Sequence, residues 1–439
     1  MLNNIESNNI KSNIFSDNII NESHKILNLY KRGHYDNKDL IDLTNLTTYS
    51  IDDEDTFEID DAISLQKVDN NYLIWIHISS PAYFITLNDP IALEAKRRSS
   101  SIYLENNITT MFPEELINSI LSLNQKEERL ALSVCAKLNN KGEIDDYSVQ
   151  RSRINNTFRL TYDDADELID FAPKEDQNLY LLSSLLQKRL NWRKKNGSIN
   201  LEGNEPKFKY NNGKIVLSSN EISVSRVLIE EAMILMGTVV SEYAIKNNIP
   251  IPFRCQNLNS NISVDNNLHY SLKNYLIKKS FNKSYYSTKY SKHSSLGLNS
   301  YVQCTSPIRR YIDLLTHFQL FNQIECKTLL SKELIDDLIS YFNNRYRQNN
   351  DIMIHNRIYM KKRYIQQNSS NVYSAYFLTW LRKDKNIANV FFENLGFEMV
   401  IKIESNNNLK FGSHIELKYS TNNTLNIAER EELISMILI

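Results

Sequence analysis

The stretch IDDEDTFEIDDAISL, residues 51–65, places an acidic run directly before an apolar one. Seven of the ten residues from 52 to 61 are carboxylic acids: Asp52, Asp53, Glu54, Asp55, Glu58, Asp60 and Asp61. The segment NYLIWIHI, residues 71–78, follows soon afterwards with the pattern of a buried strand. Acidic runs usually lie in solvent, so the place of this one between apolar segments needs a reason.

Several interpretations of the acidic run are open. A solvated turn conflicts with its apolar flanks. An EF-hand loop requires a central glycine and a terminal glutamate at fixed spacing, and the run has neither. A helix N-terminus would account for two or three acids, not seven. A divalent-metal site accounts for them all, because crowded carboxylates stay ionised when a cation neutralises them. Oxygen ligands favour Mg²⁺ or Mn²⁺ over Zn²⁺, and such clusters serve phosphodiester chemistry.

Length and composition limit the classes of protein that need to be considered. The chain has 439 residues, 41% of them hydrophobic, which predicts a large core and more than one domain. The net charge of −1 means that any nucleic-acid site must be a local channel rather than a basic coat. No apolar run is long enough to predict a membrane span.

The cysteines and the N-terminus predict a cytoplasmic protein. The four cysteines form no C-x-x-C pair, so neither a zinc site nor a disulfide framework is expected: Cys135, Cys255, Cys304 and Cys326. The Asn-rich start has neither a signal-peptide apolar region nor the composition of a transit peptide. A reducing compartment is therefore the expected setting.

The hydrophobic patterns predict an α+β fold in three parts. Residues 1–40 form a partly flexible N-terminal arm, residues 41–368 mix strands and helices, and residues 369–439 form a small β-barrel resembling an OB fold. Strands are expected at 71–78, 127–139 and 143–154, and long helices at 223–248 and 334–367. The basic residues of the last helix are expected on a solvated face.

Two further segments carry candidate site residues. The helix at 223–248 is apolar nearly all round except for Glu230 and Glu231, so one or both carboxylates pair with a core arginine or contact a polar ligand such as a ribose. In TSPIRRY, Thr305 or Ser306 is expected to cap a helix whose first turn carries Arg309 and Arg310.

Arginines at a helix N-terminus lie at the positive end of the helix dipole, which is unfavourable. A phosphate bound at this end would offset the unfavourable charge. Pairing with Asp313 is the structural alternative, although one aspartate cannot satisfy both Arg309 and Arg310. A phosphate site at this end of the predicted helix is therefore favoured.

Three motifs, YSIDDEDTFEIDDAISL, RVLIEEAMILMG and LGLNSYVQCTSPIRRYIDLLTHFQL, resemble in order and spacing those of the ribonuclease II / ribonuclease R family. The resemblance spans residues 41–368. It implies an RNB-type catalytic domain of mixed sheet and helices around a deep channel, and a Mg²⁺-dependent processive 3′→5′ exoribonuclease that converts single-stranded RNA to nucleoside 5′-monophosphates.

The resemblance also implies roles for individual residues. The four acids of the metal site fall on Asp52, Glu58, Asp60 and Asp61. The family's catalytic arginine falls on Arg309.

RNA contacts follow in the same way. The glutamate that contacts the 3′-terminal nucleotide falls on Glu230, with Glu231 as the neighbouring alternative. TYDDAD places a tyrosine near the scissile end at Tyr162, and RRSSSIYL places a base-stacking tyrosine at Tyr103. Arg310 is expected to assist Arg309 in binding RNA.

Four departures from the family pattern alter these expectations. Glu58 stands where many relatives have aspartate, and Leu201 lies near the position of an aromatic that clamps the terminal base, so the base stack is one-sided. The segment HISSPA lacks an acid. Only about 40 residues precede the catalytic domain, so N-terminal cold-shock modules are expected to be absent, and the C-terminal module is shortened. A weaker hold on RNA is expected.

The sequence thus predicts a monomeric exoribonuclease that uses Mg²⁺ or Mn²⁺ and binds single-stranded RNA. The main alternative is a catalytically weak or inactive RNA-binding protein with the same fold. A phosphatase acting on small phosphomonoesters fits TSPIRR and the C-terminal module less well.

Overall fold

A computed structural model describes most of the chain. The described residues are 14–35, 40–104, 107–174, 177–199, 201, 203, 206–211, 213–218, 223–259, 265, 267–404, 408–420 and 433–438. Within them, no helix is both long and apolar enough to cross a membrane.

The centre of the fold is a mixed seven-stranded sheet in the order β1-β8-β7-β4-β3-β2-β9. Its strands are β1 (Ile41–Asp42), β2 (Thr48–Ile51), β3 (Asp61–Val68), β4 (Asn71–Ser79), β7 (Glu128–Leu138), β8 (Ile144–Asn155) and β9 (Phe158–Leu160). The long central strands are antiparallel, and the short edge strands β1 and β9 run parallel to their neighbours. The strands predicted at 71–78, 127–139 and 143–154 are confirmed.

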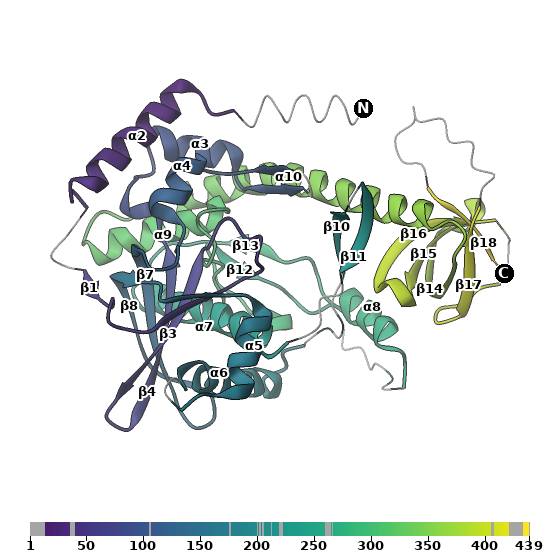
Figure 1. Ribbon diagram of the computed structural model, residues 1–439, viewed down its shortest axis with the longest axis horizontal. Coiled ribbons are helices and arrows are strands. Elements are labelled where there is room, and N and C mark those ends of the chain that lie inside the picture. Colours follow the sequence, from purple (N-terminus) through teal and green to yellow (C-terminus); the bar gives the residue numbers. More distant parts are fainter. Residues whose placement is uncertain are drawn as a thin grey trace.

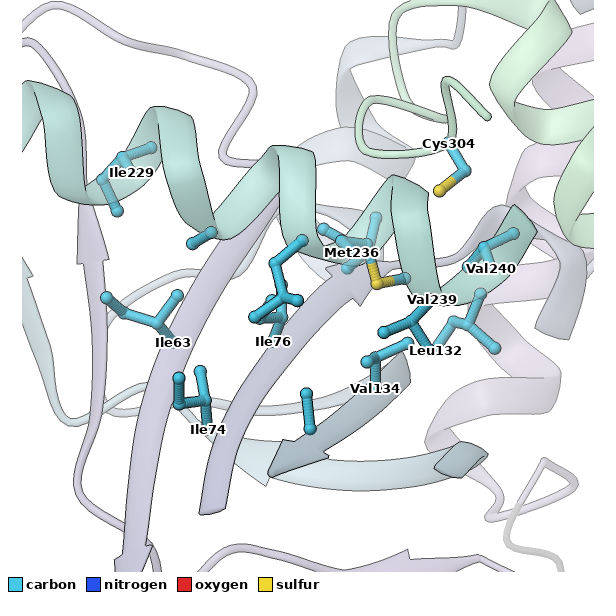
Figure 2. Packing of buried hydrophobic residues seen from close by; sticks show 14 of the residues in the cluster. Ile63, Ile74, Ile76, Leu132, Val134, Ile229, Met236, Val239, Val240 and Cys304 are labelled. Atoms are coloured by element: carbon cyan, nitrogen blue, oxygen red, sulfur yellow. The ribbon is translucent and has the colours of Figure 1, made fainter. Parts of the chain in front are cut away.

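Helix α7 (Val224–Lys246) covers the sheet and forms the largest core with it. Figure 2 shows Ile229, Met236 and Val240 of this helix above Ile63 and Ile76 of the strands. Gly237 permits close packing, because a Cβ there would lie 2.3 Å from the Tyr301 ring and from the Val302 carbonyl oxygen. The helix predicted at 223–248 is confirmed and is a rigid support for its side chains.

Most of the remaining α-helices lie around the sheet, whereas α8 lies nearer the C-terminal module (Figure 1). They are α2 (Asp17–Lys31), α3 (Pro90–Arg98), α4 (Glu114–Leu116), α5 (Tyr162–Phe171), α6 (Asn178–Lys195), α8 (Tyr270–Ser280), α9 (Tyr311–Ile324) and α10 (Lys332–Gln367). The part of the N-terminal arm that is described is largely α2, which buries Ile19 and Leu27 in a second core. Residues 1–13 and 36–39 of the predicted arm lie outside the described residues.

Three two-stranded sheets complete the part of the chain that precedes the C-terminal module. They are β5 (Ile102–Leu104) with β6 (Asn107–Thr109), β10 (Lys207–Asn211) with β11 (Lys214–Ser218), and β12 (Phe253–Cys255) with β13 (Tyr285–Ser287). The β10–β11 hairpin lies beneath α10 on the side nearest the C-terminal module (Figure 1). Phe208 of this hairpin packs in the module's core, with its ring centroid 5.8 Å from that of Phe397.

The C-terminal module is a closed barrel in the order β14-β15-β16-β18-β17. Its strands are β14 (Val372–Arg382), β15 (Ile387–Phe392), β16 (Phe397–Ile403), β17 (His414–Tyr419) and β18 (Ser435–Leu438). Helix α10 runs from the part of the molecule that contains the seven-stranded sheet to this barrel (Figure 1). Lys361 of α10 donates to the Glu398 carbonyl oxygen at 3.0 Å, so the predicted barrel is attached to the end of the predicted helix.

Helix α9 does not begin where the sequence predicted. It starts at Tyr311 with Arg310 as its N-cap residue, so the expectation of a helix from Thr305 or Ser306 is wrong. Tertiary contacts explain the later start: the Ile308 N–H donates to Asp60, and the Tyr311 N–H donates to the Ser99 carbonyl oxygen. The segment before Tyr311 is therefore a turn between elements, and Arg309 lies in that turn.

Candidate active site

The acidic run is the connection between β2 and β3, and backbone hydrogen bonds attach it to its surroundings. The Asp52 N–H donates to the Leu160 carbonyl oxygen at 3.1 Å. The Asp60 carbonyl oxygen accepts from the Ser79 N–H at 2.8 Å, and the Ile59 carbonyl oxygen accepts from the Leu123 N–H at 3.0 Å. The run is thus continuous with the sheet, which explains its place between apolar segments.

The seven acids divide by exposure. Glu58 and Asp60 are 4% and 3% exposed, and Asp52 and Asp61 are half-buried. Asp55 and Glu54 face solvent. Asp53 is also half-buried, but Lys207 and Arg226 pair with it. The four acids assigned by the family resemblance lie at or just before the start of β3 and at the end of β2.

Burial and mutual repulsion make these carboxylates hard to ionise. Burial, with the Asp60 charge, raises the pKa of Asp52 to about 7. Burial raises the pKa of Glu58 to about 7 and that of Asp60 to about 6, the Arg309 charge limiting the rise at Asp60. The pKa of Asp61 is raised well above its usual range by burial and by the charges of Asp52 and Asp60. The cluster carries more negative charge than its protein neighbours neutralise.

A divalent cation fits this donor set by chemistry, because all four side chains offer hard oxygens. The carboxylates of Asp52 and Asp61 accept no hydrogen bond from any described residue. The side chains are not arranged as a closed cage, since within the described part of the chain no three acidic, histidine or cysteine groups are placed to hold an ion. His77, the histidine nearest in sequence, is unavailable: Ser64 and Ser133 occupy its two ring nitrogens at 2.9 and 2.7 Å.

Arg309 and Asp60 form the link between the two sequence motifs. Arg309 Nε donates to Asp60 Oδ2 at 2.9 Å, and Asp60 Oδ1 accepts from the Ile308 N–H at 3.1 Å. A further bond from Arg309 Nη2 to Ser306 Oγ, at 2.7 Å, holds the guanidinium in place. The Arg309 side chain remains 39% exposed, so it can still receive a phosphate.

Arg310 has a different environment. Its Nε and Nη2 both donate to Asp313 Oδ2, at 3.1 and 2.6 Å, and the same oxygen accepts from the Ser306 N–H at 2.9 Å. Asp313 is fully buried. The pairing that the sequence offered as the structural alternative holds for Arg310, whereas Arg309 turns to Asp60. The expected RNA contact of Arg310 has no support from this geometry.

Tyr103 stands at the edge of the acidic cluster, on β5. Its hydroxyl donates to Glu58 Oε2, and Ser101 Oγ donates to Glu58 Oε1 at 3.0 Å. Tyr103 is 40% exposed, so part of the ring faces solvent while the hydroxyl is anchored. Both Glu58 oxygens thus already accept one hydrogen bond each.

The two glutamates of α7 have separate roles. Glu231 is 2% exposed and accepts from Arg193 Nε of α6 at 2.9 Å, with a second contact from Nη2. This is the core ion pair that the sequence offered as one alternative. Glu230 is exposed, and partial burial of its carboxylate, with the Glu231 charge, raises its pKa. The glutamate free to contact a ligand is therefore Glu230.

Two other predicted residues are placed more loosely. Tyr162 begins α5, and burial together with the charges of Asp52 and Asp61 raises the pKa of its hydroxyl, so it lies beside the acidic cluster. Leu201 is 42% exposed and lies between residues outside the described part of the chain. A role of Leu201 in binding the terminal base therefore stays a prediction.

Sequence reasoning missed Asp53, Lys207 and Arg226. The Lys207 ammonium of β10 and Arg226 Nη2 of α7 both donate to Asp53, the latter at 3.0 Å. One signal was available: Arg226 lies in the first turn of α7, where a basic residue opposes the helix dipole.

Comparisons with known proteins agree with this geometry. The RNB domain family matches residues 40–325. An uncharacterized ribonuclease of Synechocystis is 34% identical over 364 residues, covering 82% of this chain and 55% of that protein. The chloroplastic/mitochondrial ribonuclease II of Arabidopsis thaliana is 36% identical over 291 residues, covering 64% and 36%. The chain thus spans between about a third and about half of the length of these relatives.

A solved structure supports the fold. Mycoplasma genitalium RNase R, in complex with ribose-methylated single-stranded RNA, superposes with a TM-score of 0.83 at 19% identity. The superposition covers 97% of this chain and 76% of that one, so it extends over both the seven-stranded sheet with its helices and the C-terminal barrel. The predicted RNB-type architecture with an OB-like barrel is confirmed.

Proposed function

The chain belongs to the RNB domain family, and on that premise we propose that it is a processive 3′→5′ exoribonuclease acting on single-stranded RNA. The observation that carries the proposal is the hydrogen bond between Arg309 and Asp60, which brings a phosphate-binding group to a cluster of carboxylates. Both halves of a phosphodiester hydrolysis site then lie together.

The substrate enters with its 3′ end first. Tyr103 presents its exposed ring to a base, a contact typically worth about 1–3 kcal/mol. Glu230 accepts a hydrogen bond from the terminal ribose, which selects RNA over DNA. Tyr162 supports the terminal nucleotide from the N-terminus of α5.

The carboxylates Asp52, Glu58, Asp60 and Asp61 would hold Mg²⁺, or Mn²⁺ in its place, and the ion would supply positive charge and a more acidic water. Asp60 holds the Arg309 fork toward the substrate, and Arg309 binds the scissile phosphate and offsets its developing charge. Water oxygen bonds to phosphorus, the bond to the 3′ oxygen breaks, and that oxygen takes a proton. Each cycle consumes one water and releases one nucleoside 5′-monophosphate.

The alternative is an RNA-binding protein that keeps the fold with little or no catalysis. The observation that favours it is the lack, within the described residues, of a preformed cage for an ion. Asp52 and Asp61 support the enzyme instead, because both are half-buried and their carboxylates accept no hydrogen bond from any residue that the structure describes. A cytoplasmic location and a monomeric state stay predictions, as do the domain limits at residues 40 and 368.

A gel assay separates the two functions. The purified protein is incubated with a 3′-tailed RNA in Mg²⁺ or in a chelator, and both binding and shortening are followed. Shortening that requires the ion supports the exoribonuclease. Binding in both conditions without shortening supports the non-catalytic alternative.

A further inference from the structure

Arg226 makes two contacts at the edge of the site. Its Nη2 donates to Asp53 Oδ1 at 3.0 Å, and its guanidinium carbon lies 3.8 Å from the centroid of the Tyr162 ring. One side chain thus joins the acidic loop, through the residue next to Asp52, to the tyrosine at the start of α5. Planar stacking of this kind is specific to arginine, because an ammonium group has no flat face.

The element that carries Arg226 is firmly held. Ser225, its neighbour, donates from its N–H to Asp166 Oδ1 at 2.8 Å and from its hydroxyl to the Tyr162 carbonyl oxygen at 3.0 Å. These bonds join the first turns of α5 and α7. The rest of α7 is packed on the sheet, as Figure 2 shows, so Arg226 projects from a rigid base.

Arg226 also lies one helical turn before Glu230. Residues four apart on a helix lie on the same face, so α7 presents Arg226 and Glu230 toward the same side. The Arg226 side chain is 28% exposed and that of Asp53 is 30% exposed. An ion pair at that exposure adds little to the free energy of unfolding. Its main effect is therefore on the positions of the side chains that it joins.

We infer that Arg226 is a positioning residue, which holds the Asp52–Asp53 corner of the acidic loop and the Tyr162 ring in register with Glu230 for the reaction. The inference rests on the proposed function. Arg226 acts through Asp53 and Tyr162 and does not touch the RNA. Small displacements of groups around a reacting centre lower turnover strongly, so its loss should appear in kcat.

The test compares single and double variants of the full chain on one long RNA. Arg226→Ala should lower kcat about tenfold and leave KM and RNA affinity in a chelator within about twofold of wild type. Arg226→Lys keeps the charge toward Asp53 and loses the stacking, so it should be intermediate. Asp53→Asn combined with Arg226→Ala should be no worse than the more damaging single variant, because the two residues act as one unit.

The matched control is Lys209→Ala. Lys209 of β10 pairs with Asp55 of the acidic loop at 3.5 Å, and both side chains are exposed. It should leave kcat unchanged.

Three outcomes overturn the inference and leave the proposed function standing. With active wild type, an Arg226→Ala kcat within about twofold overturns the inference alone. A KM raised about tenfold at normal kcat shows a direct RNA contact instead. Fully additive effects of Asp53→Asn and Arg226→Ala show that the pair is not a unit. A wild-type protein without activity overturns the proposed function, and this inference with it.

Discussion

Arg309 Nε donates to Asp60 Oδ2 at 2.9 Å, although the two residues are 249 positions apart in the sequence. This bond joins the turn before α9 to the loop before β3. Asp60 is almost fully buried, whereas the Arg309 side chain is 39% exposed. The Asp60 carboxylate is therefore the fixed partner. It orients the Arg309 guanidinium, part of which remains exposed to solvent.

Asp60→Asn should abolish turnover and spare RNA binding. The substitution removes a negative charge from the cluster. The amide NH₂ of the new asparagine must face either Arg309 or the Ile308 N–H, and both of these groups are themselves donors. We expect kcat to fall at least about 100-fold, near 2.7 kcal/mol of transition-state stabilisation. Gel-shift affinity measured beside degradation rate checks this, with the exposed Asp55→Asn as the control. Retained cleavage, or equal loss of cleavage and affinity, would contradict it.

Arg309→Lys and Arg310→Met should fail in different ways. Lysine at position 309 keeps the charge and loses the planar fork, so turnover should fall at least about tenfold, or ~1.4 kcal/mol, with normal stability. Methionine at position 310 leaves the buried Asp313 unpaired and should cost about 3–5 kcal/mol of unfolding free energy. Denaturant melts and steady-state rates of both variants decide this. Near-normal rates for Arg309→Lys would show that Arg309 is structural.

The metal-free protein should lose stability as pH rises from about 4 to about 7. Burial raises the pKa of Glu58 to about 7 and that of Asp60 to about 6, so the folded state binds more protons than the unfolded state in that window. The free energy of unfolding therefore falls with increasing pH, by on the order of 2 kcal/mol per group.

Adding Mg²⁺ should reverse this trend, since the ion binds the deprotonated carboxylates. Urea melts in chelator and in Mg²⁺ at both ends of the window measure the effect. Asp52→Asn should flatten the pH dependence in chelator, because it removes one repelling charge. A metal-free stability that rises across the window would contradict the account.

Glu58→Gln should raise the Mg²⁺ concentration needed for half-maximal activity, because it removes one charge from the cluster. Glu58→Asp keeps the charge and withdraws it by one methylene from Ser101 and Tyr103, so its defect should be smaller. Excess Mg²⁺ or Mn²⁺ should relieve both. Asp55→Asn is the control: it removes a solvent-facing carboxylate from the same loop and should keep the normal Mg²⁺ requirement. A normal requirement in Glu58→Gln would remove Glu58 from the metal site.

The C-terminal barrel should add RNA affinity outside the channel. Deleting the chain after residue 370 is expected to weaken binding and flatten its salt dependence, since fewer phosphates would be neutralised. Cleavage of short oligomers should survive in part. Because Phe208 of β10 packs in the barrel core, circular dichroism must first show that the shortened protein is folded. Unchanged affinity would make the barrel a structural cap.

Elements with strong local patterns were predictable from sequence. The apolar run of β4, the nearly all-apolar α7 and the short strands of the barrel each carry their period within a few residues. The start of α9 was not predictable in this way. Ser306 and Pro307 are good local start signals, but long-range bonds from Asp60 and Ser99 take the backbone groups of that turn.

The sequence indicated which residues belong to the candidate site, but it did not indicate which arginine pairs with which carboxylate. The family motif marks Asp52, Glu58, Asp60 and Asp61, and the fold makes these carboxylates hard to ionise, whereas their role as metal ligands stays a prediction. Which arginine contacts which acid depends on tertiary approach: Arg309 goes to Asp60, Arg310 to Asp313, and Arg193 to Glu231. Arg226 was missed because its partners, Asp53 and Tyr162, are distant in sequence and belong to separate elements.

The most direct test of the account is the product analysis of one single-stranded RNA, labelled at its 5′ end and digested in Mg²⁺. The account predicts that the label stays on RNA shortened from the 3′ end, and that nucleoside 5′-monophosphates accumulate from the first time point. Asp60→Asn, bound to the same RNA, should release none. Internal fragments, products that carry a 3′-phosphate, or equal release by Asp60→Asn would contradict the central claim.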